Sequence, residues 1–237
     1  AYAGNRATNN VTAVYRKQWV GIEGAPVTAN ISWDKRNEDS NVGYGLQVYS
    51  DKIGIESTVG IQGFYSFRIA TEESSLSLGI SAGILNYRAD YIDVTTNTSN
   101  DPMFSENVNG FRPTFGIGAL YARENWYAGL SIPALLQTKI YHDNVSVTSG
   151  ASNHYFLTGG YIFRLEPDFK VKPSILFKAV TGAPLEVDLN INGWYKDLIG
   201  LGASYRTGDS FVGMFEVQLT PQVRLGYAYD YPFSVLN

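Results

Sequence analysis

Residues 111–122 read FRPTFGIGALYA, and this stretch sets the interpretation of the whole chain. The odd positions carry Phe, Pro, Phe, Ile, Ala and Tyr, whereas the even positions carry Arg, Thr, Gly, Gly, Leu and Ala. Successive side chains of a β-strand point to opposite faces, so this period of two gives one apolar face and one face of small or polar residues. The pattern indicates a strand that separates two different environments.

The same contrast recurs along the chain. Residues 75–84 set Leu, Ile and Ala against Ser and Gly, and residues 185–192 set Leu, Val and Ile against Glu, Asp and Asn. A soluble barrel of this size would need an interior filled with apolar side chains, yet the residues available here are Gly, Ser, Asn, Gln, Arg, Asp and Glu. The apolar faces therefore point outward, which is typical of a β-barrel in a lipid bilayer.

We predict an all-β fold, a transmembrane antiparallel β-barrel that forms a single domain over residues 1–237. Gly, Pro, Asn and Asp mark tight turns at 51–54, 123–125, 166–168, 181–184, 207–209 and 220–222. The thirteen predicted strands are 10–19, 25–34, 42–50, 54–70, 75–91, 111–123, 126–134, 153–165, 169–180, 184–194, 196–206, 210–220 and 222–231.

Two connections are long, 92–110 and 135–152, and both are rich in Asn, Thr, Ser and Asp without an apolar period. We interpret them as surface loops. They are the fifth and seventh connections, so they share a side of the barrel. Bacterial outer-membrane barrels keep long loops outside the cell, which predicts that the N-terminus lies on the periplasmic side.

An odd strand number is unexpected, because single-chain bacterial barrels have an even number of strands. The chain starts at Ala1 without an initiating Met or signal peptide and stops soon after Tyr231-Pro232. We expect about fourteen strands in the intact protein, with the last strand missing from this chain. The missing signal peptide says nothing against export.

Composition fits a membrane barrel. No Cys is present, which excludes a disulfide framework. The 17 Tyr and 4 Trp suit the aromatic girdles at the edges of the apolar band. The net charge of −4 and the lack of a basic stripe argue against nucleic acid as a partner. Tyr-rich alternation also occurs in secreted β-sandwiches and solenoids, but the strands of a sandwich rarely reach the roughly 9 to 11 residues of a membrane strand.

Catalytic, cofactor and metal sites are not expected. Ser152, Asn153 and His154 have the chemistry of a membrane lipase, but adjacent strand residues point apart and cannot form a nucleophile and base by themselves. Segment 97–109 lacks the ligand spacing of an EF-hand calcium loop. The Gly pairs at 116–118 and 159–160 precede no helix that could bind phosphate.

Three carboxylates could form a site on one face of the strands. Glu186 and Asp188 share a face that Glu216 could join. An acid and base pair is one interpretation. A hydrated lumen wall is the better one, with cations that balance the carboxylates: Arg164, Lys172, Lys178 and Arg206.

Short motifs follow one another over essentially the whole chain: Ala1-Tyr2-Ala3-Gly4, Tyr15-Arg16-Lys17-Gln18-Trp19, Gly24-Ala25-Pro26, Asp51-Lys52-Ile53-Gly54, His154-Tyr155-Phe156-Leu157, Gly159-Gly160-Tyr161, Lys172-Pro173-Ser174, Gly182-Ala183-Pro184, Gly202-Ala203-Ser204-Tyr205-Arg206 and Gly226-Tyr227-Ala228-Tyr229-Asp230. In this order they resemble the PorP/SprF family of outer-membrane proteins from Bacteroidota. The specificity lies in the ordered set, because each motif alone is weak.

This resemblance implies a place in the type IX secretion system. Proteins of the family help to export, anchor or attach a cell-surface protein through its C-terminal domain, or couple the outer membrane to periplasmic motor and peptidoglycan-binding components. In gliding bacteria the client is a large adhesin. The family has no established catalytic residues or cofactors, so none is assigned here.

Two mechanisms compete. In the first, the barrel docks a partner segment in its lumen or on a rim. In the second, it is a porin-like diffusion channel whose lining sets ion preference. A membrane-embedded hydrolase is a distant third. The candidate lumen residues are the same for both leading mechanisms: Arg16, Gln18, Arg68, Arg112, Arg164, Glu186, Asp188, Asn190, Arg206 and Asp230.

The alternation generates a direct test of lipid exposure. Replacing Ile80 or Ile117 with Arg should cost about 2 to 4 kcal/mol of folding free energy if the site lies at the bilayer midplane. Polar replacement of Ser81 or Gly118, on the other face, should be better tolerated. Unfolding in phospholipid vesicles measures both, and equal tolerance of the two faces would contradict the prediction.

Overall fold

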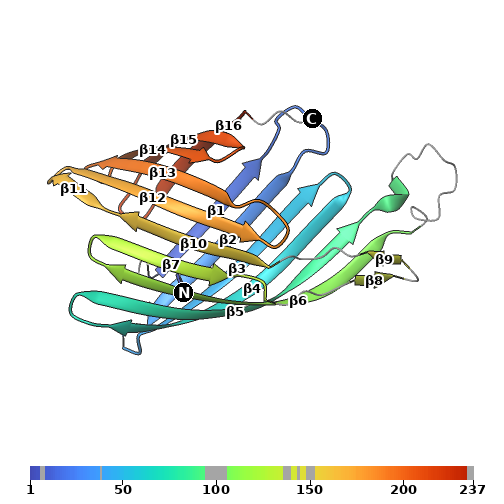
Figure 1. Ribbon diagram of the computed structural model, residues 1–237, viewed down its shortest axis with the longest axis horizontal. Coiled ribbons are helices and arrows are strands. Elements are labelled where there is room, and N and C mark those ends of the chain that lie inside the picture. Colours follow the sequence, from blue (N-terminus) through green and yellow to red (C-terminus); the bar gives the residue numbers. More distant parts are fainter. Residues whose placement is uncertain are drawn as a thin grey trace. The chain divides into compact units, whose positions relative to one another are not determined.

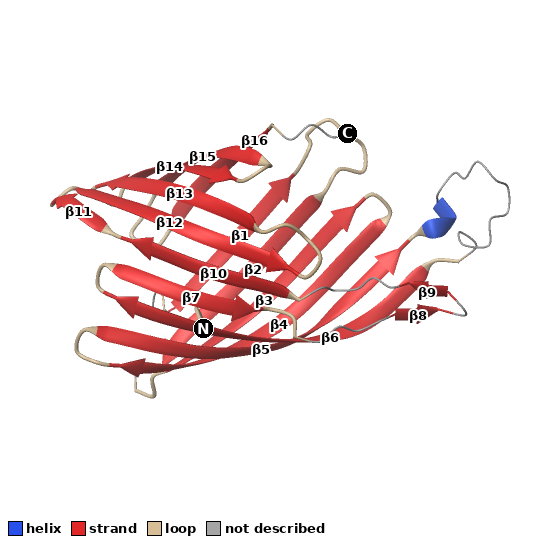
Figure 2. Cartoon of the chain, in the orientation of Figure 1, coloured by secondary structure: helices blue, strands red, loops and turns tan. Residues whose placement is uncertain are grey.

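The computed structural model describes residues 1–5, 9–37, 39–93, 106–135, 140–142, 145–147 and 153–233. Its main element is one 14-stranded sheet whose hydrogen-bonded order is β1-β2-β3-β4-β5-β6-β7-β10-β12-β13-β14-β15-β16, with β11 paired to β12 (Figures 1 and 2). The strands therefore follow sequence order, and consecutive ones run antiparallel. The predicted all-β fold class is confirmed.

The first strands are β1 (Asn9–Lys17), β2 (Val27–Asn37), β3 (Val42–Ile53), β4 (Glu56–Ala70), β5 (Ser74–Ala89), β6 (Val108–Arg123) and β7 (Trp126–Ile132). After a two-stranded sheet of β8 (Ile140–His142) and β9 (Val145–Val147) come β10 (His154–Tyr161), β11 (Phe163–Glu166), β12 (Phe169–Val180), β13 (Glu186–Tyr195), β14 (Ile199–Arg206), β15 (Ser210–Gln218) and β16 (Arg224–Pro232). A short 3-10 helix, η1 (Tyr91–Asp93), follows β5.

The chain divides into two compact units. Unit 1 comprises Ala1–Ile69, Ser77–Gly118 and Pro133–Asn153, and unit 2 comprises Ala70–Leu76, Ala119–Ile132 and His154–Asn237. In both units one face of the strands is apolar and exposed, and we call it the outer face. The other face carries small and polar residues that are less exposed, and we call it the inner face.

In unit 1, β1 to β4 pair in series, from Asn9↔Lys35 through Val27↔Lys52 to Val42↔Phe67. Their outer face includes Ile31 and Ile61, with Ile80 on β5 and Ile117 on β6, each about half exposed. The inner face instead buries Ser66, Ser77, Arg112 and Thr114. The alternation in the sequence therefore corresponds to an inner and an outer face.

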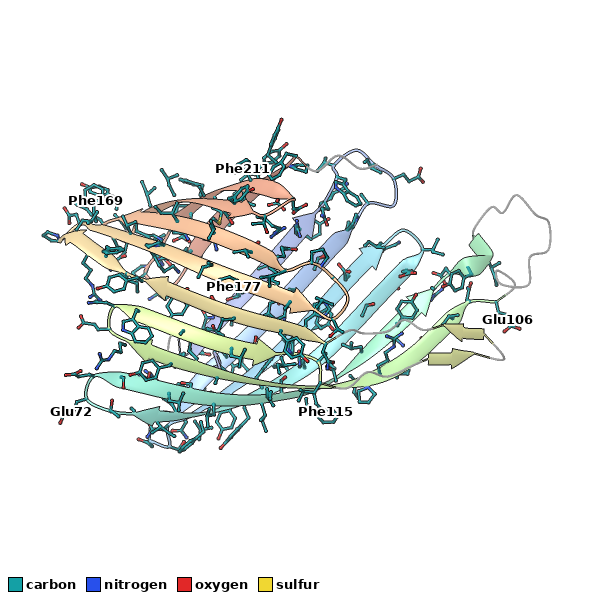
Figure 3. All side chains as sticks on the ribbon, in the orientation of Figure 1. Glu72, Glu106, Phe115, Phe169, Phe177 and Phe211 are labelled. Carbon is teal, nitrogen blue, oxygen red and sulfur yellow. The ribbon has the colours of Figure 1, made fainter. Side chains whose placement is uncertain are left out.

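In unit 2, β7, β10 and β12 to β16 pair in the same antiparallel manner. Phe169 and Phe211 lie on the outer face, where about half of each side chain is exposed (Figure 3). Strand β11 continues the direction of β10, and its pairing with β12 shifts register between Arg164 and Glu166. The sequence predicts one strand over 153–165, which in the structure is interrupted at Ile162, where Ile162 N donates a 2.6 Å hydrogen bond to Asn125 O, while the register with β12 is the same on both sides.

The turn between β13 and β14 was not predicted as a separate connection. Lys196 and Asp197 both have positive φ, 54° and 55°, and Leu198 N donates a 3.0 Å hydrogen bond to Tyr195 O. Two central residues with positive φ define the type I′ turn that matches the twist of a hairpin. Neither Gly nor Asn marks this site, which is why the sequence pattern places only one residue between the two strands.

Each of the thirteen predicted strands has a counterpart in the sheet. Further differences lie in the long connections, which hold η1 and the β8–β9 pair in addition to irregular chain. Residues 94–105, 136–139, 143–144 and 148–152 of these loops lie outside the described residues. The strand order ends at β1 and β16, and no pairing joins those two strands among the residues described. A further closing strand stays a prediction.

In the part of the chain that the structure describes, no helix has the length and apolar character needed to cross a membrane.

Candidate functional site

Five charged side chains of unit 2 gather on the inner face. We call Lys178, Glu186, Asp188, Arg206 and Asp209 the inner charge cluster. Lys178 Nζ lies 2.6 Å from Glu186 Oε1 and 2.8 Å from Asp188 Oδ2. Arg206 Nε lies 3.1 Å from Glu186 Oε1 and 3.0 Å from Asp188 Oδ1, and its Nη1 lies 3.0 Å from Asp209 Oδ2. Lys178 therefore bridges two carboxylates, and Arg206 bridges three.

Strand register brings these residues together. Lys178 on β12 is paired with Glu186 on β13, and Asp188 is paired with Arg206 on β14. Residues two apart on a strand share a face, and cross-strand partners lie side by side, so the four charges form a block on one face. Asp209 joins from the turn after β14, where Asp209 N donates a 3.2 Å hydrogen bond to Arg206 O.

The cluster is partly withdrawn from water. Only 9% of the Asp188 side chain is exposed, against 22% for Lys178 and 23% for Arg206. A carboxylate this buried needs cationic partners, and here it has two. Three carboxylates face two cations, which leaves an excess of one negative charge. Glu186 and Asp209 are the more exposed carboxylates, so the excess is presented to solvent.

The cluster lies at the end of unit 2 where a long connection enters. Lys178 is paired with Phe156, two residues after His154 begins β10. Phe156 is in turn paired with Ser131, next to the end of β7 at Ile132. The connection between β7 and β10 therefore leaves and re-enters unit 2 beside the cluster.

The opposite end of unit 2 has a different charge arrangement. Ion pairs there join successive turns or strands: Glu73–Arg123 at 2.6 Å, Glu124–Arg164 at 3.0 Å, Asp168–Lys196 at 3.8 Å, Lys170–Asp197 at 2.5 Å and Glu216–Arg224 at 2.9 Å. Figure 3 shows Glu72 in the β4–β5 turn at this end. These side chains are mostly exposed, so each pair contributes little to stability by itself.

Several candidate lumen residues from the sequence lie at or near the inner charge cluster. Glu186, Asp188 and Arg206 belong to it. Asn190 lies two residues along the same face of β13, and its Nδ2 donates a 3.5 Å hydrogen bond to Asp188 O. Asp230, on β16, is paired with Val212 and is partly buried.

The other candidates lie elsewhere. Arg164 is at the opposite end of unit 2, where its Nη1 contacts Glu124 and Asn125. In unit 1, Arg112 is buried and lies over the ring of Tyr87, 5.2 Å from its centroid. Arg68 has a buried Nε without a hydrogen-bond partner among the described residues. Arg16 is exposed on β1, and Gln18 N donates to Pro26 O at 2.9 Å.

Sequence reasoning named Lys178 only as a balancing cation and did not include Asp209. The missing information was register. The Lys178 and Glu186 positions flank a turn that contains Gly182 in positive φ, at 87°. Counting outward from that turn pairs the two residues. The same count from Gly208, with φ of 73°, places Arg206 beside Ser210 and next to Asp209.

The residues considered for catalysis do not form a site in the described chain. His154 is exposed at the start of β10, with its ring stacked 6.2 Å from that of Phe156. Ser152 lies outside the described residues. Glu216 is separate from Glu186 and Asp188, because its carboxylate binds Arg224 and accepts from Trp194 Nε1. Among the described residues, no group of three or more His, Asp or Glu side chains could hold a metal ion.

An exposed apolar face backed by a polar one, on antiparallel strands that follow sequence order, defines a membrane protein that crosses the bilayer with strands. The sequence matches the family model for the type IX secretion system membrane protein PorP/SprF over residues 1–237. The chain belongs to this family, and its location is the outer membrane. The family's description names a membrane component of a secretion system and no catalysed reaction.

Solved structures give more distant similarities. One is a chain from work on the in-meso crystallization of membrane proteins, with a TM-score of 0.42 and 11% identity over 95% of this chain and 83% of that one. Another is a mutant porin of Rh. blastica, with a TM-score of 0.38 and 9% identity over 95% of each chain. Comparison with curated proteins finds no match. The family match is what identifies the chain.

The burial of Asp188 yields a stability test. Replacing Asp188 with Ala leaves Lys178 and Arg206 with one carboxylate fewer in a partly buried place, and should lower the free energy of unfolding by about 3 kcal/mol. Asp209→Ala removes an exposed partner of the same Arg206 and should cost no more than about 1 kcal/mol. Urea unfolding in vesicles measures both, and equal losses would show that burial does not set the contribution.

Proposed function

We propose that this barrel docks a secreted cell-surface protein at the end of unit 2 that carries the inner charge cluster, next to the end of β7 and the start of β10. The observation that carries the proposal is the cluster itself, a compact set of charges on the inner face beside the entry of the β7–β10 connection. Membership of a type IX secretion family supports a protein as the client. The barrel would hold the C-terminal domain of that client during export or anchoring.

Charge chemistry supports a polypeptide ligand with basic residues. Glu186 and Asp209 keep part of their carboxylates exposed, 39% and 45% of their side chains, while Arg206 holds both in place. Charge-assisted hydrogen bonds to such carboxylates are short and directional. A Lys or Arg of the client would neutralise the excess negative charge without disturbing the buried Asp188.

The side of the membrane follows from strand parity. The β5–β6 and β7–β10 connections are the long ones, and in an antiparallel series such alternate connections emerge on one side. Long loops of bacterial barrels are extracellular. The cluster would therefore face the cell exterior, and the ion-paired turns of unit 2 would face the periplasm, where other secretion and peptidoglycan-binding components would be met.

A diffusion channel is the second candidate, and the polar inner face favours it. Gly, Ser and Asn line much of that face, as they would in a hydrated pore. The two functions differ in what they require of the inner charge cluster. A docking site needs its carboxylates for client retention, whereas in a channel they would only alter ion preference.

Site-specific photo-crosslinking in the native outer membrane separates these functions. A photoreactive side chain at Asn190, on the inner face, or at Thr181, in the turn beside the cluster, should capture a secreted cell-surface protein. The same side chain at Leu201, on the outer face, should not. Capture confined to the first two sites supports docking.

Glu186→Gln provides the matched functional test, since it removes one exposed carboxylate of the cluster. It should reduce surface display of the client roughly tenfold, which corresponds to about 1.4 kcal/mol of binding free energy. Glu124→Gln, at the ion-paired end of the same unit, is the control and should leave display unchanged. Unchanged display in both variants, together with an altered cation preference of Glu186→Gln in planar bilayers, would establish the channel instead.

A further inference from the structure

The N-terminal residues Ala1–Asn5 lie against the inner face of unit 1, and we call them the strap. Ser66 Oγ on β4 donates a 2.8 Å hydrogen bond to Ala3 O. Asn5 Nδ2 donates to Ser77 Oγ on β5 at 3.1 Å. Gly4 N donates to Asp34 Oδ2 on β2 at 3.3 Å. The strap is thus bound to three strands that are not neighbours of its own segment in the sequence.

The wall beneath the strap is shaped to receive it. A Cβ on Gly43 would overlap the carbonyl of Ala3, and a Cβ on Gly79 would overlap the backbone of Ala1. All three atoms nearest to the latter Cβ belong to Ala1. Glycine at these positions lets another backbone approach closely. We call the surface formed by Asp34, Gly43, Ser66, Ser77 and Gly79 the seat.

The strap is suited to the seat in the same way. Gly4 has φ of 72°, and a Cβ there would lie 3.0 Å from Cβ of Arg36. An L-residue with a side chain is disfavoured in this conformation, most of all a β-branched one. Tyr2 is 41% exposed, whereas Ser66 and Ser77 beneath the strap are 2% and 1% exposed.

We propose that the seat is a binding site for a short segment of small residues folded as a tight turn, as in the strap, where Asn5 N donates a 3.0 Å hydrogen bond to Tyr2 O, and that the strap occupies the seat reversibly. The strap contributes backbone groups and small side chains, while the seat contributes two hydroxyls, one carboxylate and two glycines. The ligand class is therefore an Ala- and Gly-containing peptide that forms a tight turn, with glycine at the position of positive φ. Releasing the strap uncovers a polar strip on the inner face of β2 to β5. This inference is independent of the client docking proposed above.

Thiol labelling tests whether the strap shields the seat from solvent. The chain has no native Cys, so each introduced Cys is the single labelling site. In the full chain folded in phospholipid vesicles, Ser66→Cys should react slowly with a water-soluble maleimide. Ser81→Cys, two residues beyond Gly79 on the same face, should react rapidly. Adding Gly4→Val should accelerate labelling of Ser66→Cys roughly tenfold, since the substitution strains the strap and leaves the wall unchanged.

Gly21→Val is the matched control. Gly21 also has positive φ, 99°, but no atom lies within 4 Å of its Cβ position. This change should leave labelling of Ser66→Cys unaltered. Equal rates for Ser66→Cys and Ser81→Cys without Gly4→Val would overturn the strap, and so would acceleration by Gly21→Val as large as that by Gly4→Val.

A disulfide gives the independent geometric check. A Cβ on Gly45 would lie 3.5 Å from Cβ of Ala3, within the separation of about 3.5 to 4.5 Å that disulfides require. Ala3→Cys with Gly45→Cys should therefore cross-link on oxidation. Ala3→Cys with Gly63→Cys, on the outer face of β4, should not. A cross-link in both pairs, or in neither, would contradict the seated position.

A synthetic peptide tests whether the seat binds a separate peptide. A synthetic peptide with the sequence AYAGN, in millimolar excess, should slow labelling of the Ser66→Cys, Gly4→Val variant again. The peptide AYAVN should not, because Val takes the place of the glycine in positive φ. Equal labelling with either peptide would overturn the peptide site.

Discussion

The structure depends on one constraint, which is that a backbone in lipid must satisfy its own N–H and C=O groups. Antiparallel pairing of neighbouring strands meets this requirement for the strands that lie between β1 and β16 in the sheet. The side chains are then free to differ between the two faces. Ile80 and Ile117 suit hydrocarbon, and Ser77 and Arg112 suit a hydrated interior, because the backbone makes no demand on either set.

The polar inner face holds charged side chains close to one another, and the two ends of the strands of unit 2 differ in how these charges are paired. At the loop end of unit 2, Lys178 and Arg206 compensate the buried Asp188 through pairs on adjacent strands. At the other end the pairs are exposed and lie between turns. Buried pairs are costly to break, whereas exposed pairs are easily exchanged with water. The loop end is therefore the end at which charge is held in a defined geometry.

Much of the fold could be predicted from alternation, because a period of two can be recognised in the sequence without any knowledge of strand pairing. Two kinds of feature could not. The Lys196-Asp197 turn has the positive φ values of a hairpin without the usual glycine, so its residue types carry no turn signal. The strap contacts strands far away in the sequence, as between Asn5 and Ser77, which are 72 residues apart, and local sequence patterns do not report such contacts. For the inner charge cluster, the alternation indicates that Glu186 and Asp188 share a face. The contacts of Arg206 with these two carboxylates and with Asp209 depend on the pairing of β13 with β14, which the alternation does not give.

The ion-paired turns of unit 2 also have a mechanical consequence. Glu73–Arg123, Glu124–Arg164 and Asp168–Lys196 join four successive turns into one series. Antiparallel hydrogen bonds lie perpendicular to the strands, so a force along a strand loads the whole ladder in shear instead of opening it one bond at a time. A pull on one strand at the loop end would reach its turn at the far end, and the linked turns would spread that load over the neighbouring hairpins.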